Sequence, residues 1–151
     1  MSASDACESD LLKLLFQNIS WANVGNAGGL LQSTVAGSFF VSLHTADPGE
    51  AGTQTTNETS YTGYARVAVA RSAGGWTLSG TSPTQVANAA VVTFGACTAG
   101  PVTVTHFAIG RDTLGTGEII CSGALAASLS ITAAPSITPS FAIGALVATC
   151  D

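Results

Sequence analysis

Residues 64–71 read YARVAVAR, and their side chains alternate in character with a period of two. Ala65, Val67 and Val69 fall on one face of an extended segment, while Arg66 and the other even-numbered residues fall on the opposite face. This period is that of a half-buried β-strand. We therefore predict a strand here whose inner face holds the valines.

Similar short runs of β-branched and aromatic residues fill most of the chain, separated by Gly, Pro, Asn, Ser and Thr. The predicted strands are 39–44, 64–71, 77–79, 85–94, 102–110, 118–124, 128–131 and 140–148. About eight strands in a chain of 151 residues predict an all-β fold, a single β-sandwich of jelly-roll-like or immunoglobulin-like type.

The exception is the N-terminal region, where leucines fall at helical spacing within residues 5–19. Asp5 followed by Glu8 resembles a capping box, so we predict a short amphipathic helix. Such a helix is marginal alone and must dock either on its own β domain or on another subunit. A Gly-rich connector follows, which gives two predicted regions, 1–36 for helix and connector and 37–151 for the β-sandwich domain.

The stretch Thr45–Thr62 is a long polar loop between two predicted strands. Loops of this length are costly to order and are commonly functional. We expect this loop to make contacts between subunits. Within it, Asp47-Pro48-Gly49 is ordinary turn chemistry, which we prefer to an acid/base or metal cluster with His44 and Glu50.

The composition favours a permanent assembly. Hydrophobic residues make up 46% of the chain and charged residues only 9%, against about 25% charged in ordinary soluble domains. The net charge is -5, and the four cations are far apart in sequence, so nucleic-acid binding is not expected. Neither a basic secretory signal nor an apolar run long enough to span a membrane is present, which predicts synthesis in the cytoplasm and no membrane partner.

Motifs of catalysis and of cofactor binding are missing from the sequence. It holds no nucleophile elbow, phosphate-binding loop or dinucleotide fingerprint. Cys7, Cys97, Cys121 and Cys150 form no CxxC pair and are expected to be buried thiols, with disulfides left open. We expect no enzymatic activity, no cofactor and no metal, and His106 reads as a strand histidine.

Several segments together resemble a family of small tailed-bacteriophage and prophage virion proteins, often labelled phage tail fibre protein. The resemblance is carried by SLHTADPGE at 42–50, TQTTNE at 53–58, YTGYARV at 61–67 and Gly75-Trp76. It implies a virion structural protein. From size, β architecture and low charge we predict first a head decoration or minor capsid protein that stabilises the shell, and as the alternative a tail or tail-fibre component involved in host attachment.

The expected partners are further copies of the chain, in a small symmetric oligomer, and the major capsid protein or other virion proteins. Aromatic residues dominate the energetics of interfaces, and Tyr61, Tyr64 and Trp76 could instead form a saccharide platform or pack a strand edge. The candidate interface residues are Leu11, Leu15, His44, Asp47, Tyr61, Tyr64 and Trp76.

Overall fold

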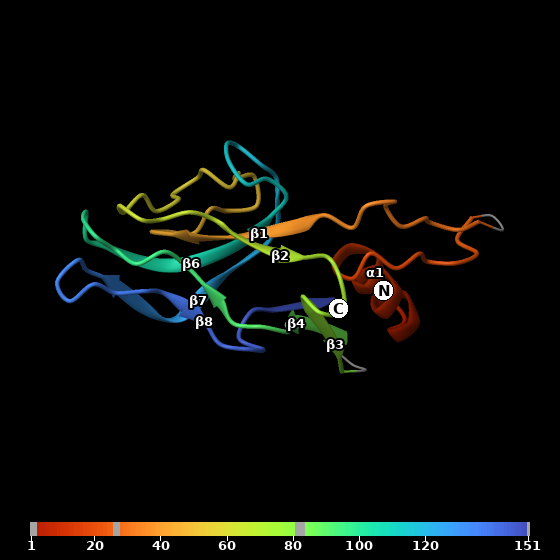
Figure 1. Cartoon of the computed structure of the whole chain (residues 1–151). Coiled ribbons are helices and arrows are strands. Elements are labelled where there is room, and N and C mark those ends of the chain that lie inside the picture. The colour runs from red at the N-terminus through yellow and green to blue at the C-terminus, as the bar shows by residue number, and fades with distance from the viewer. Residues whose placement is uncertain (1–2, 26–27, 81–83, 151) are drawn as a thin grey trace. The chain divides into compact units, whose positions relative to one another are not determined.

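A computed structural model describes residues 3–25, 28–80 and 84–150. These residues form one helix and nine strands (Figure 1). The elements are α1 Asp5–Phe16, β1 Ser38–His44, β2 Val67–Ala70, β3 Trp76–Ser79, β4 Thr84–Asn88, β5 Val92–Thr93, β6 Val102–Gly110, β7 Ile119–Ile131, β8 Ser140–Phe141 and β9 Val147–Cys150. The prediction of an all-β chain preceded by a short N-terminal helix is confirmed.

The strands form three sheets, ordered β2-β1-β6-β7, β3-β4-β9 and β5-β8. The chain divides into two compact units. The first unit comprises Met1–Ser38, Val69–Val91 and Phe141–Asp151, and the second comprises Phe39–Ala68 and Val92–Ser140. Helix α1 thus shares a unit with β3, β4 and β9. The division predicted from the sequence, into a helix and connector at 1–36 and a β-sandwich domain at 37–151, stays a prediction.

The second unit is built on the antiparallel pairs β1-β6 and β6-β7. Its core includes Val41, Leu43, Val104 and Ile109, which are almost fully buried. Ser42 and His44 on the other face of β1 are buried as well, so both faces of this strand are covered. Between Val104 and His106 the partner on β7 jumps from Leu129 to Ala124, so residues 125–128 lie opposite Thr105 alone. Such a bulge bends a strand without ending it. The strands predicted at 118–124 and 128–131 are therefore one strand.

The strand predicted at residues 64–71 is β2, which is shorter and covers Val67–Ala70. Val69 is buried while Ala68 and Ala70 are exposed, so the predicted alternation is confirmed over 67–70. It was wrong at residues 65 and 66, because Ala65 is exposed and the Arg66 side chain forms a buried ion pair with Glu58.

One buried asparagine interrupts two of the predicted strands. The Asn88 amide nitrogen donates to the carbonyls of Ala90 and Ala142, each at 2.8 Å, and its oxygen accepts from the Leu146 N–H at 2.8 Å. These bonds hold turns where the sequence predicts continuous strands over 85–94 and 140–148. Both predictions were wrong in extent, because an alternating pattern does not show that an asparagine side chain replaces ladder bonds.

Helix α1 begins at Ser4, whose hydroxyl accepts from the Cys7 N–H. The predicted cap by Asp5 and Glu8 was wrong. Glu8 is buried and its carboxylate accepts from the Thr84 N–H, so it holds the helix to β4. The helix ends at Phe16 rather than residue 19, and Asn18 adopts a positive φ of 55°.

The C-terminal end of α1 is stabilised by Arg71. Its guanidinium donates to the carbonyls of Leu14 at 2.8 Å and Leu15 at 2.6 Å, and to Ala36 at 3.1 Å. A cation at this end satisfies unpaired carbonyls and complements the helix dipole.

Of the two docking modes left open for the helix, the structure shows packing on its own chain. Leu12 and Phe16 are buried, and the Phe16 ring meets Trp76 edge to face, with centroids 4.9 Å apart. The Gln17 amide donates to the Trp76 carbonyl at 2.8 Å. The helix therefore completes the core of the first unit.

We predict that Phe16→Ala lowers the free energy of unfolding by about 3–5 kcal/mol, since it leaves a cavity beside Trp76. Ile19→Ala is the matched control, because this side chain is exposed and its loss should change stability by less than about 0.5 kcal/mol. Urea unfolding followed by circular dichroism measures both. Equal stability of the two variants would mean that α1 is a detachable appendage.

Candidate functional site

The long loop Thr45–Thr62 folds back on its own unit. The Thr45 N–H donates to the Asn57 carbonyl at 2.8 Å, and the Thr59 N–H donates to Leu43 at 2.9 Å. Further along, the Gln54 N–H donates to the Gly117 carbonyl at 2.8 Å. These bonds account for the order of the loop without a partner subunit. The predicted contact of this loop with another subunit stays a prediction. The entropic cost of ordering the loop does not require such a contact, because hydrogen bonds within the chain offset it.

The loop is fixed by a buried ion pair between Glu58 and Arg66. Two nitrogens of the guanidinium donate to the two carboxylate oxygens, each at 2.7 Å, and the Arg66 side chain is only 4% exposed. The remaining bonds of Arg66 run to the carbonyls of Asp112 at 2.9 Å and Gly115 at 2.8 Å. One side chain thus joins the β1-β2 loop to the β6-β7 loop.

Tyr64 extends this network to the sheet. Its hydroxyl donates to Glu58 at 2.8 Å and accepts from the Leu43 N–H at 3.1 Å. Burial raises the pKa of Tyr64 well above its usual value, and the hydrogen-bonded Glu58 carboxylate raises the pKa of Arg66. The phenol therefore stays neutral and the guanidinium stays charged at all ordinary pH values.

Gln54 has a structural role in the loop that was not predicted from the sequence. Its side chain is fully buried, and its oxygen accepts from the Asp112 N–H at 2.9 Å. It lies directly against the α-carbons of Gly110 and Gly117, where any Cβ would collide with it. A lone glutamine in a Thr-rich loop gives no sequence signal for this role.

His44 lies in the core on the same strand as Ser42, and both are fully buried. The His44 Nδ1–H donates to the Thr56 carbonyl at 2.8 Å, which leaves Nε2 to accept from the Ser42 hydroxyl at 2.8 Å. Burial lowers the pKa of His44, so the neutral ring is favoured. Residues 42 and 44 share a face because strand side chains alternate.

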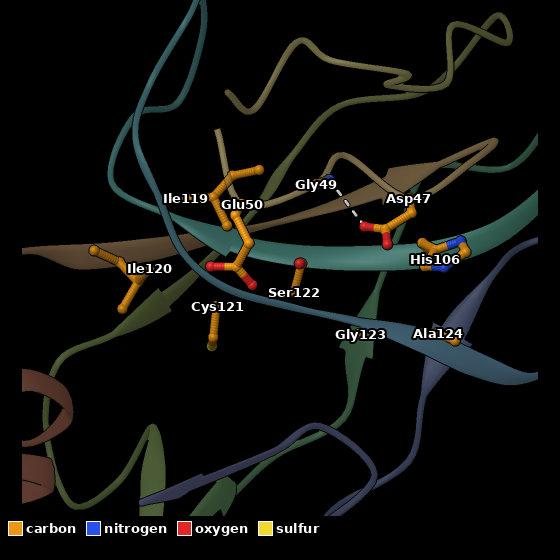
Figure 2. Close-up of a pocket in the computed structure, with 10 residues that line it drawn as sticks. All are labelled: Asp47, Gly49, Glu50, His106, Ile119, Ile120, Cys121, Ser122, Gly123 and Ala124. Carbon is orange, nitrogen blue, oxygen red and sulfur yellow. Dashed lines mark hydrogen bonds between the residues drawn. The ribbon is translucent and has the colours of Figure 1, made fainter. Parts of the chain in front are cut away.

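An open groove of about 610 Å³ lies between the loop and the β6-β7 pair (Figure 2). Asp47 and Glu50 contribute carboxylates from the loop side, and Ser122 comes from β7. Asp47 also accepts from the Gly49 N–H at 2.9 Å, as predicted for turn chemistry. The lining residues are Asp47, Gly49, Glu50, His106, Ile119, Ile120, Cys121, Ser122, Gly123 and Ala124.

The groove is acidic, and none of the described residues that line it is Lys, Arg, Phe, Tyr or Trp. Burial raises the pKa of Cys121 to about 11, so its thiol stays protonated. Among the described residues, no three His, Cys, Asp or Glu side chains are placed to hold a metal ion. No described helix is long and apolar enough to cross a membrane.

The candidate interface residues are mostly interior. His44 and Trp76 are fully buried, and Tyr61 is 4% exposed, with its hydroxyl donating to the Gly95 carbonyl at 2.8 Å. Tyr64 is half-buried and packs edge to face on Tyr61. His44, Trp76 and Tyr61 fill the cores of their own units, and the interface role of the candidate residues stays a prediction. Leu11 and Leu15 are half-buried and Asp47 is exposed.

Exposed apolar side chains are concentrated on an arm, residues 17–37, which extends beyond α1 (Figure 1). The two segments of the arm are joined by a pair of backbone hydrogen bonds, in which the N–H groups of Trp21 and Leu30 each donate to the carbonyl of the other residue at 2.9 Å. Leu31 and Val35 are 74% and 79% exposed, and Ile19 and Leu30 are also exposed. The arm contains no charged residue.

A family model described as podophage GP4 fiber I protein gp80 matches residues 2–149, nearly the whole chain. The chain belongs to this family. The resemblance to tailed-phage virion proteins of the tail-fibre type is thereby confirmed. No curated protein gives a significant match to the chain. Membership in the fibre I family places this chain in a family of phage structural proteins.

We predict that Arg66→Met lowers the free energy of unfolding by about 3–5 kcal/mol, because it leaves the Glu58 carboxylate with the Tyr64 hydroxyl but without a cation, and removes a donor from two loop carbonyls. The double variant with Glu58→Gln should lose less. The control is Arg111→Gln, whose ion pair with Glu118 is exposed and should contribute at most about 1 kcal/mol. Similar losses in Arg66→Met and Arg111→Gln, measured by urea unfolding, would refute the central role of the network.

The lowered pKa of His44 predicts a specific pH dependence. Unfolded His44 takes up a proton near its ordinary pKa of about 6.5, which the folded core resists. Its contribution to stability is complete above that pH and is lost as the pH falls below it. Between about pH 7.5 and about pH 5.5, His44→Gln should therefore lose less stability than the wild type, as measured by urea unfolding. An equal loss of stability in the wild type and in His44→Gln over this range would contradict the prediction.

Proposed function

We propose that this protein is a structural subunit of the tail fibre of a podophage-type particle and takes part in host attachment. The observation that carries the proposal is the family match over residues 2–149, whose description names a fibre protein. Head decoration, the first prediction from the sequence, has less support, because it rested on size, β architecture and low charge. The location that we propose within the virion is therefore the tail fibre.

The proposal includes no enzymatic role. Ser42 and His44 are hydrogen-bonded as a nucleophile and base would be, yet both are fully buried, so a substrate cannot reach the hydroxyl. The thiol of Cys121, which does line the open groove, is kept protonated by burial. Hydrolysis of a host-surface polysaccharide by the purified protein would contradict this part of the proposal.

The proposed partners are further copies of the chain and other virion proteins, not nucleic acid or membrane. The four cations already bond within the chain: Arg66 to Glu58, Arg71 to helix carbonyls, Lys13 to Asp10, and Arg111 to Glu118. A phosphate backbone is bound by clustered free cations. The uncharged arm at 17–37 supports protein contacts instead.

Deletion of the gene from the phage tests the proposal. We predict that particles lacking the protein adsorb to host cells at least tenfold more slowly, while the heat inactivation of their heads is unchanged. Adsorption rate and DNA release on heating are the two measurements, and re-supplied protein should restore adsorption. Normal adsorption with heads that release DNA at lower temperature would instead establish the decoration role.

A further inference from the structure

Strand β7 ends the four-stranded sheet with an unpaired edge. In the described part of the chain, neither a strand nor an isolated bridge pairs with its outer side. Half of the N–H and C=O groups of an edge strand point outward, ready to pair with another chain. At 13 residues, β7 is also the longest strand of the fold.

Natural edge strands are protected by shortness, charge or proline. The opposite edge of the same sheet follows this rule, because β2 has four residues and is flanked by Arg66 and Arg71. Strand β7 has neither a charged residue nor a proline between Ile119 and Ile131. The two register shifts between β6 and β7 lie on either side of Cys121–Ala124. Within this run each residue pairs with β6 in regular register, so the outer edge of the run is free of bulges.

The side chains of that run are small. Cys121, Ser122, Gly123 and Ala124 offer little bulk, and Ser122 and Ala124 are exposed. A second strand can therefore approach closely on the outer side. Beyond the run, Ile120 and Leu125 are larger, and in an antiparallel pair each can lie opposite a small residue of the other copy.

We propose that β7 pairs antiparallel with β7 of a second copy of this chain about a two-fold axis. An antiparallel edge is complementary to itself, because each copy supplies the same donors and acceptors in reversed order. A second copy fits this edge because β7 carries no charged residue, so the two-fold axis brings no like charges of the two strands opposite each other. The pairing is a property of the purified protein and does not depend on whether the virion holds it at the tail or the head.

A charge-swap experiment on the full chain tests the pairing in any register. The two variants are Ser122→Lys with Ala124→Lys, and Ser122→Glu with Ala124→Glu. Each alone brings like charges together across the axis and should weaken dimerisation by about tenfold or more. An equimolar mixture of the two should recover wild-type association. Sedimentation velocity over a range of concentrations measures all three samples.

The matched control places the same charge on the other edge of the sheet. Ala68→Lys with Ala70→Lys alters exposed positions of β2 and should leave the dimer intact. Amide hydrogen exchange of the wild type is the second measurement, and protection within 121–124 should rise with protein concentration. A wild type that stays monomeric, a dimer unaffected by the β7 variants, or exchange independent of concentration would each overturn the proposal.

Discussion

The ion pair between Glu58 and Arg66 is the interaction on which the loops of the second unit depend. A charge removed from water is tolerated only when its hydrogen-bonding capacity is met. Arg66 meets this condition with bonds to both Glu58 oxygens and to the carbonyls of Asp112 and Gly115. Because those groups lie in two different loops, satisfying one charge fixes both loops, and the acidic groove takes its wall from one of them.

The first unit uses a second arginine in the same way. Arg71 donates to the last carbonyls of α1 and to Ala36, so it joins the helix to the chain that follows the arm. Two of the chain's four cations are thus directed at internal groups. Because the sequence has few charged residues and two of its cations bond internally, few charges are left at the surface to oppose association.

Local periodicity was sufficient to predict the fold class, and it failed wherever a side chain replaced a backbone partner. The alternation over 64–71 located β2, and the leucine spacing located α1. Asn88, which bonds the turns between predicted strands, and Glu8, which bonds Thr84 instead of capping the helix, act through contacts distant in sequence. The same limit applies to the site: Gln54 and the Ser42–His44 pair depend on partners that no local pattern specifies.

The interior positions of the expected anchors also constrain how the protein associates. Protein interfaces usually depend on a few aromatic and arginine side chains, yet Tyr61 and Trp76 are in the cores and Arg66 and Arg71 bond internally. What remains at the surface is an aliphatic arm, an acidic groove and an open strand edge. Contacts of this kind are individually modest, because they lack buried anchors. They gain strength when many copies repeat them in one assembly, since subunits held in place bind neighbours at high effective concentration. In the fibre subunit that we propose, repetition of this kind supplies the association free energy that each single contact lacks.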